Sequence, residues 1–198
     1  MMNKTRSKIK ATKSLILRNF TENDVEALFK LLNDETVNTY LPWFPVKNRE
    51  EANTFLKERF LNEYDKGECY RYAICLKEDN LPIGYVWLSN DESHDFGYAL
   101  MQEHWHKGIA LEASQAVIEQ LKEAGYTYIT STHDIHNPRS GEVMKKLGME
   151  YKYSYVEQWH PKNIPVTFRM YQLNLDGQDR TFMKYWNQYE VHFIEDIA

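Results

Sequence analysis

The nine residues Trp105-His106-Lys107-Gly108-Ile109-Ala110-Leu111-Glu112-Ala113 decide how this chain is interpreted. They follow a strand-like run over 95–101 and open a helical pattern that continues to about residue 123. A turn of small residues before a helix leaves backbone N–H groups unpaired, and these groups attract phosphate together with the positive end of the helix dipole. Because Gly108 has no side chain and Ala110 a very small one, the turn predicts a binding site for a phosphate-bearing cofactor. The alternative is an ordinary helix start that binds nothing.

The composition is that of a single folded domain. The chain has 198 residues, of which 42% are hydrophobic and 14% aromatic, enough for a sizeable core. No apolar run approaches the length that spans a membrane, so we expect no membrane partner. The net charge of −5 argues against a general nucleic-acid binder and is compatible with a cationic acceptor such as an amine or a basic peptide end.

The first residues and the cysteines indicate the cellular context. Residues 1–14 are basic, contain no acidic residue and lack the apolar segment of a secretory signal, so we expect a flexible leader. A short organelle-targeting segment is the alternative. Cys69 and Cys75 do not make a disulfide scaffold, and no cysteine or histidine spacing indicates zinc or another metal. We therefore expect a cytoplasmic protein without a metal site.

Strand-like and helical segments follow one another in a definite order. Strands are expected over 15–17, 71–76, 83–88, 95–101, 126–132, 150–159 and 166–175. Helices are expected after the caps Thr21 and Asn48, after Gly108, and over 138–147 before Gly148. Antiparallel strands followed by a strand–helix–strand unit predict an α/β (α+β) fold with a mixed, mostly antiparallel sheet.

The last part of the chain carries an aromatic stripe. Its members follow helical spacing: Phe182, Tyr185, Trp186, Tyr189 and Phe193. We expect residues 176–198 to form a helical extension that covers its own domain, with a dimer contact as the alternative. Residues 15–175 then form one domain, and the protein is a monomer or a homodimer.

Two ordered motifs and the order of the elements resemble the GNAT superfamily of acetyl-CoA-dependent N-acetyltransferases. The motifs are the stretch over 105–113, preceded by Phe96-Gly97-Tyr98-Ala99-Leu100, and the stretch Asn137-Pro138-Arg139-Ser140-Gly141. The resemblance covers about residues 15–175 and is greatest to the RimJ/RimL-like branch, the ribosomal-protein N-terminal acetyltransferases. It implies a GNAT-type sheet with helices on both faces.

The resemblance implies acetyl-CoA as the cofactor, with CoA as product. Its pantetheine arm would pair with backbone like an added strand. The residues implied in cofactor binding are Tyr98, Ala99, Leu100 and Met101 for the arm, His106, Lys107, Gly108, Ile109 and Ala110 for the pyrophosphate, and Asn137 for the arm again. The chain departs from the family at Trp105, at His106, and at Met144, where many members carry a tyrosine acid.

Acetyl transfer to an amine by direct attack needs an amine without its extra proton and a group near the departing sulfur. By its place in the second motif, Ser140 is the candidate near the sulfur, and a serine that only bonds backbone at a helix start is the alternative. For the base we rank Glu157 and His133 ahead of Asp95. A water chain that ends on one of them would serve as well.

Three aromatic residues around a proline-fixed loop, Tyr40, Trp43 and Phe44, are candidates for a wall of the acceptor site. A hydrophobic lid over the second helix is the alternative. The acceptor is a primary amine, either a protein N-terminus or a small molecule. The rival function is a non-catalytic acyl-CoA-binding module with the same fold, which the missing tyrosine at Met144 keeps open.

Overall fold

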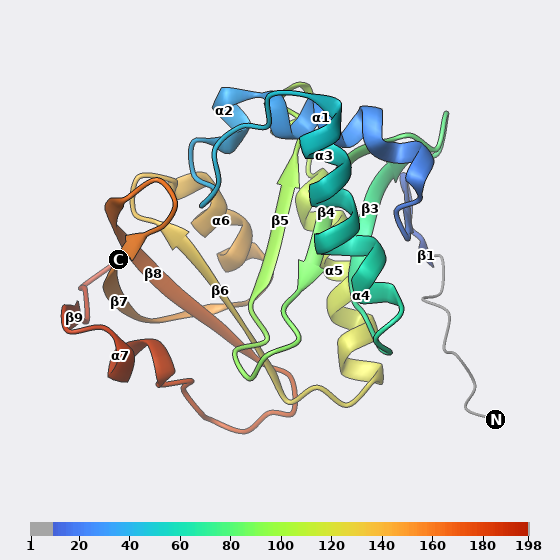
Figure 1. The fold of residues 1–198 in the computed structure, drawn as a ribbon. Helices are drawn as coiled ribbons and strands as arrows, with labels where there is room; N and C mark the ends of the chain where they lie inside the picture. Colours follow the sequence, from blue (N-terminus) through green and yellow to red (C-terminus); the bar gives the residue numbers. More distant parts are fainter. Residues whose placement is uncertain (1–9, 198) are drawn as a thin grey trace. The chain divides into compact units, whose positions relative to one another are not determined.

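The computed structural model describes residues 10–197, which form two compact units (Figure 1). The first unit contains residues 10–41, 45–88 and 98–117. The second unit contains residues 42–44, 89–97 and 118–197. The phosphate-binding turn expected from the sequence belongs to the first unit, and the three candidate catalytic residues belong to the second.

The first unit is built on a sheet with the strand order β1-β2-β3-β4-β5. Its strands are β1 (Lys10–Ala11), β2 (Leu15–Arg18), β3 (Arg71–Leu76), β4 (Pro82–Leu88) and β5 (Phe96–Leu100), of which the last begins in the second unit. The pairs β1–β2, β2–β3 and β3–β4 are antiparallel. The observed bounds of β3, β4 and β5 confirm, within one or two residues, the strands expected over 71–76, 83–88 and 95–101.

Several short helices and the first part of α5 pack around this sheet. They are η1 (Glu22–Asp24), α1 (Val25–Asn33), α2 (Glu35–Asn38), α3 (Arg49–Leu56), η2 (Lys57–Leu61), α4 (Asn62–Tyr64), η3 (Gln102–His104) and α5 (Ile109–Glu123). The Thr21 N–H donates to the Asp24 carboxylate at 2.7 Å, and the Glu51 N–H donates to Asn48 at 2.9 Å, which confirms both expected caps. The helices α1 and α3 cover one face of this sheet, and the first part of α5 covers the other (Figure 1).

An aromatic cluster forms the centre of the core between the sheet and α1 and α3. Phe60 is fully buried, and its ring centroid lies 4.4 Å from that of Phe20 and 5.6 Å from that of Tyr85. Cys75 in β3 belongs to the same core, and Cys69 just ahead of β3 is also buried. Both cysteines are unpaired, and burial raises the pKa of each thiol to about 11.

The expected leader is only partly within the described residues, because residues 1–9 lie outside them. Its described part is folded: Lys10 donates to the Ala116 carbonyl at 2.8 Å. Thr12 and Ser14 donate to the two carboxylate oxygens of Glu112 at 2.6 and 2.7 Å. These bonds tie residues 10–14 to the first part of α5, so this stretch is a structural part of the first unit.

The second unit contains an antiparallel sheet with the strand order β6-β8-β7-β9. Its elements are β6 (Tyr128–Asp134), α6 (Pro138–Lys146), β7 (Glu150–Trp159), β8 (Ile164–Asn174), α7 (Lys184–Gln188) and β9 (His192–Phe193). The segment over 89–97 joins this unit through the Ser131 hydroxyl, which donates to the Phe96 carbonyl at 2.7 Å, and through a parallel bridge between Asp95 and Thr130. The expected α+β fold with mostly antiparallel strands is confirmed.

The aromatic stripe of the tail forms less helix than its spacing predicts. Helix α7 has only five residues, and the chain then becomes extended and pairs as β9 with the edge of β7. This pairing satisfies backbone N–H and C=O groups at the edge of β7, which a longer helix would have left without partners. The expected cover is nevertheless present, since four stripe residues pack against the buried side chains of β7 and β8: Phe182, Tyr185, Trp186 and Tyr189.

No helix among the described residues has the length and apolar character needed to cross a bilayer.

Candidate functional site

The turn between β5 and α5 is fixed by a tryptophan. Trp105 donates its indole N–H to the Leu100 carbonyl at 2.8 Å and its backbone N–H to Gln102 at 3.1 Å. The indole therefore ties the end of β5 to the start of the next loop. Trp105 is one of the positions at which this sequence departs from the expected family pattern. In the structure its indole anchors the turn to the end of β5.

The residues after Trp105 expose backbone in a left-handed conformation. His106 has φ +61° and Gly108 has φ +75°, and both residues are exposed together with Lys107. Residues other than glycine seldom adopt this conformation, so His106 holds a backbone geometry that glycine adopts more readily. A Cβ atom placed on Gly108 would meet no heavy atom within 4 Å. The space next to this glycine is therefore open.

Helix α5 adds backbone donors to the same corner. Its first bond of the i to i−4 type runs from the Glu112 N–H to the Gly108 carbonyl at 3.0 Å, so the N–H groups of residues 109–111 have no acceptor inside the helix. Ile109 is buried and fixes the helix start. An open turn, N–H groups without an acceptor inside the helix and the positive helix end suit a pyrophosphate. We call residues 106–110 the phosphate corner.

Strand β5 leads directly into this corner and has one edge committed to β4. The Met101 N–H donates to the Ile83 carbonyl at 2.9 Å. A Cβ atom on Gly84 would lie 2.2 Å from the Ala99 carbonyl oxygen, so only glycine allows this approach of the two backbones. Ala99, Leu100 and Met101 are buried, and Tyr98 is half-buried. Because β5 stands at the end of its strand order, its other edge is the one that an added strand would use.

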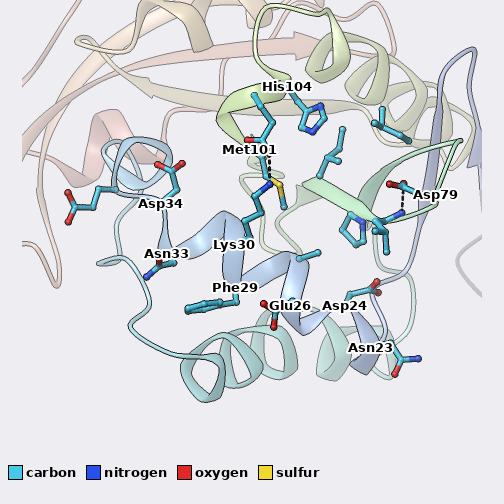
Figure 2. A pocket seen from close by; sticks show the side chains of 17 residues that line it. Asn23, Asp24, Glu26, Phe29, Lys30, Asn33, Asp34, Asp79, Met101 and His104 are labelled. Carbon is cyan, nitrogen blue, oxygen red and sulfur yellow. Dashed lines mark hydrogen bonds and ion pairs between the residues drawn. The ribbon is translucent and has the colours of Figure 1, made fainter.

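A separate groove of about 920 Å³ lies in the first unit beside α1 (Figure 2). Met101 and His104 line it, and Lys30 pairs with Glu103 at 2.5 Å across it. Its other lining carboxylates are Asp24, Glu26, Asp34, Glu35 and Asp79. This excess of negative charge would repel a polyphosphate, so the phosphate corner suits CoA better than the groove does.

In the second unit, the Asn-Pro motif starts α6. The Asn137 N–H donates to the Asp134 carbonyl at 2.8 Å, and the Ser140 N–H donates to the Asn137 carbonyl at 3.2 Å. Ser140 is half-buried in the first turn of the helix, and Pro138 occupies the first helical position, where no N–H is needed. Met144 is buried on the same helix, so no proton donor occupies this position.

His133 lies under α6. Its exposed fraction is 4%, its Nδ1 bonds to the Asp134 carbonyl at 2.8 Å, and its buried Nε2 has no hydrogen-bond partner among the described residues. Since a carbonyl only accepts, Nδ1 carries the hydrogen. Burial lowers the pKa of His133, and the positive charge of Arg169 lowers it further. A Cβ atom on Gly141 would lie 2.6 Å from Nε2, so the neutral imidazole is pressed against α6.

Glu157 is in a different environment, on β7 opposite Val166. It is half-buried, and burial raises the pKa of its carboxyl, while a hydrogen bond from the Tyr189 hydroxyl opposes the rise. Asp95 interacts electrostatically with Glu157. Burial raises the pKa of Asp95 to about 7, helped by the charges of Asp91 and Glu157, and its buried Oδ1 has no partner in the described part of the chain. Glu157 therefore interacts electrostatically with Asp95 and Tyr189, whereas His133 lies beside α6 and Asn137.

Tyr189 was not among the site residues expected from the sequence. Its place in the aromatic stripe indicates cover for a core, and a stripe carries no sign that one hydroxyl reaches a carboxylate. The three aromatic residues expected near the acceptor differ in exposure: Phe44 is 58% exposed, Tyr40 is 37% exposed, and Trp43 is half-buried. Tyr40 belongs to the first unit, and the other two belong to the second.

Comparisons with known proteins identify the family of this chain. The acetyltransferase (GNAT) domain family matches residues 14–150. The uncharacterized N-acetyltransferase YnaD of Bacillus subtilis (strain 168) is 30% identical over 142 residues, which are 70% of this chain and 80% of that protein. The ribosomal protein uS5-alanine N-acetyltransferase of Escherichia coli (strain K12) is 27% identical over 121 residues, 55% of this chain and 61% of that protein.

A solved structure extends the agreement to the fold. RimL, a ribosomal-protein α-N-acetyltransferase in complex with coenzyme A, superposes with a TM-score of 0.75 at 20% identity, over 86% of this chain and 99% of that chain. The match over residues 14–150 and the 30% identity to an N-acetyltransferase establish the family. This chain belongs to the GNAT family of N-acetyltransferases, with acetyl-CoA as the implied acetyl donor.

Proposed function

We propose that this protein transfers the acetyl group of acetyl-CoA to the α-amino group of a protein N-terminus. The observation that carries the proposal is the phosphate corner, where backbone N–H groups without an acceptor inside the helix begin α5 beside the open space at Gly108. Bound there, acetyl-CoA supplies a thioester that an amine attacks directly. Lys107 adds a positive charge beside the phosphates, and β5 offers its outer edge to the pantetheine arm.

The choice of acceptor rests on relatives. The uS5-alanine acetyltransferase and RimL both modify ribosomal proteins according to their descriptions, and this chain is similar to the first over 121 residues. A protein N-terminus of this kind presents a primary amine next to a small side chain. Tyr40, Trp43 and Phe44 are each proposed to contact that end of the acceptor, and the side chains of Tyr40 and Phe44 are exposed. A small-molecule amine is the alternative acceptor.

The candidate catalytic residues have distinct roles in this proposal. Glu157 accepts the proton of the amine, directly or through water, because burial gives its carboxylate a higher pKa than an exposed glutamate. Ser140 hydrogen-bonds the departing sulfur from the first turn of α6. Asn137 orients the pantetheine arm, and a β5 N–H near Leu100 stabilises the developing oxyanion. We place His133 behind Glu157, because its buried imidazole lies against Gly141.

Thiol release in an amine panel tests the proposal. The panel contains peptides that begin with Ala, Ser or Asp, the same peptides with an acetylated N-terminus, and a set of polyamines. The expected result is CoA release with at least one free peptide and none with its acetylated twin. Release with polyamines alone would replace the protein acceptor by a small amine. Binding of CoA without release from any amine would overturn the enzyme proposal in favour of a regulatory acyl-CoA-binding module.

We further propose that residues 15–175 form the catalytic domain, that residues 176–198 are its extension, and that the protein acts in the cytoplasm. Two buried unpaired cysteines suit a reducing compartment, and ribosomal proteins are acceptors of the relatives named above. The stripe residues of the tail pack on the second unit, which favours cover over a dimer contact and hence a monomer. Sedimentation equilibrium distinguishes the monomer from a homodimer.

A further inference from the structure

The segment over 182–195 is attached along β7. The Tyr153 hydroxyl donates to the Phe182 carbonyl at 2.6 Å, and the Val156 N–H donates to the Val191 carbonyl at 2.9 Å. Two further residues of this segment pair with β7 as strand β9. Bonds at both ends of the segment fix its path across the strand.

A charged contact fixes the far end of the segment. Arg169 on β8 donates to the Glu195 carboxylate through Nη2 at 2.6 Å and through Nε at 3.0 Å. The Ser154 hydroxyl donates to the same carboxylate, and the Glu195 N–H donates to the Tyr151 hydroxyl oxygen at 2.9 Å. A carboxylate with this many donors is held in one position, and the guanidinium keeps the pKa of Glu195 below its usual range.

Between these anchors, two tyrosines of the segment stack on one tyrosine of β7. The Tyr155 ring centroid lies 5.1 Å from that of Tyr185, at an interplanar angle of 27°, and 4.7 Å from that of Tyr189, at 12°. Tyr155 and Glu157 are two residues apart on β7 and therefore face the same side of the sheet. The stacked ring of Tyr189 thus lies on the same face of the sheet as Glu157, and its hydroxyl opposes the rise that burial causes in the pKa of the Glu157 carboxyl.

We infer that Tyr189, held in place by the segment over 182–195, is the positioning residue of the Glu157 carboxylate. The inference rests on the proposed function, in which Glu157 is the base. A glutamate side chain has several rotamers, and one hydrogen bond from a stacked phenol selects the rotamer in which the carboxylate stays beside Tyr155. The family match ends at residue 150, so this contact lies outside the matched part of the chain.

The groups that face Glu157 come from three elements. Asp95 precedes β5, Tyr155 lies on β7, and Tyr189 follows α7, while Val166 opposite on β8 is apolar. A negative charge on Asp95 disfavours the ionised form of Glu157, whereas the Tyr189 hydroxyl favours that ionised form. Removing that hydroxyl therefore raises the pKa of Glu157 and moves the acid limb of the rate profile toward higher pH.

Tyr189→Phe tests the inference, with Tyr185→Phe as the matched control. Each substitution removes one hydroxyl and keeps a ring stacked on Tyr155, but Glu157 is not among the groups that shift the pKa of Tyr185, whereas Ser93 and Asp95 are. The first readout is the titration of the Glu157 carboxyl by ¹³C NMR, assigned with Glu157→Gln. The second is kcat/KM against pH, with the amine found active in the panel. Tyr189→Leu serves as a second variant if Tyr189→Phe does not fold.

The expected result is a higher pKa of Glu157 in Tyr189→Phe and a fall of about tenfold in kcat/KM, with neither change in Tyr185→Phe. An unchanged pKa of Glu157 in Tyr189→Phe, or the same change in both variants, overturns the inference. A wild-type protein that releases no CoA with any amine overturns the proposed function instead, because the NMR titration still reports the contact without turnover.

Discussion

The phosphate corner and the Glu157 environment differ in how the chain builds them. The corner consists of five consecutive residues, 106–110, and we propose that it binds phosphate through backbone N–H groups at a helix start. The Glu157 environment joins side chains that are far apart in the sequence, Asp95, Glu157 and Tyr189. A backbone site depends on local conformation and on the absence of side chains, whereas a side-chain site depends on the folded arrangement of several elements. Substitutions should therefore affect the first through bulk and the second through single polar atoms.

The largest effect is expected from Gly108→Trp. The indole would fill the open space over the corner, and we expect CoA affinity to fall by more than about 100-fold, or about 2.7 kcal/mol. Isothermal titration with CoA measures the loss. Gly177→Trp is the control, since Gly177 also has φ +75° and no atom within 4 Å of an added Cβ. Wild-type affinity in Gly108→Trp, or equal loss in both variants, would contradict a phosphate site at Gly108.

Glu157→Gln should affect turnover and leave the corner intact. We expect kcat to fall by about 100-fold, because the amide cannot accept the proton, with an unchanged Kd for CoA. The wild-type rate should rise with pH as Glu157 loses its proton, at a higher pH than for an exposed glutamate because burial raises the pKa of its carboxyl. This limb should be absent in the variant. Glu150→Gln, at the exposed start of the same strand, is the control. Equal rates for Glu157→Gln and the wild-type protein would remove Glu157 from the mechanism.

Ser140→Ala should produce a smaller loss of turnover. A hydroxyl that only hydrogen-bonds the departing sulfur contributes about 1.4 kcal/mol, so we expect a fall of about tenfold in kcat. The Kd for CoA should change by less than about twofold, since the phosphate corner is untouched. Steady-state kinetics and titration measure the two effects. Glu142→Ala, on an exposed position of the same helix, is the control. Wild-type turnover in Ser140→Ala would leave the serine with a structural role at the helix start.

The smallest effect is expected from Glu195→Gln, which removes the charge that faces Arg169. Because both side chains are about one-fifth exposed, at 24% and 21%, we expect the free energy of unfolding to fall by about 1 kcal/mol at pH 7. Arg169 lowers the pKa of Glu195, so this stabilisation is present above the unfolded pKa and is lost as pH falls through the folded pKa. Urea unfolding at pH 7 and at low pH measures it. Glu190→Gln is the exposed control, and a difference that persists at low pH would contradict the ionic origin.

The sequence predicts most of the fold because its signals are local. Strands with alternating or aromatic patterns, such as Arg71–Leu76 and Glu150–Trp159, appear with the predicted bounds. The phosphate corner is predicted for the same reason, since glycine spacing and the helix start lie within a few residues. The tail is predicted less well, because helical spacing does not reveal that β7 has an edge where residues 192–193 pair.

The catalytic environment is predicted only in part. The sequence names Glu157 as one candidate base, but its interactions with Asp95 and Tyr189 depend on folding across 62 and 32 residues of sequence. His133 has the residue type of a base, yet tertiary packing places it under α6 with a lowered pKa. Burial and packing set both outcomes, and neither is a property of the local sequence.

The two buried thiols have a practical consequence for measurement. With a pKa of about 11, Cys69 and Cys75 are ionised in only about one molecule in ten thousand at neutral pH, and the thiolate is the form that reacts. Aromatic disulfide reagents added to the folded enzyme should therefore report liberated product with little background from the polypeptide. The same protection should keep the protein from cross-linking to itself in air.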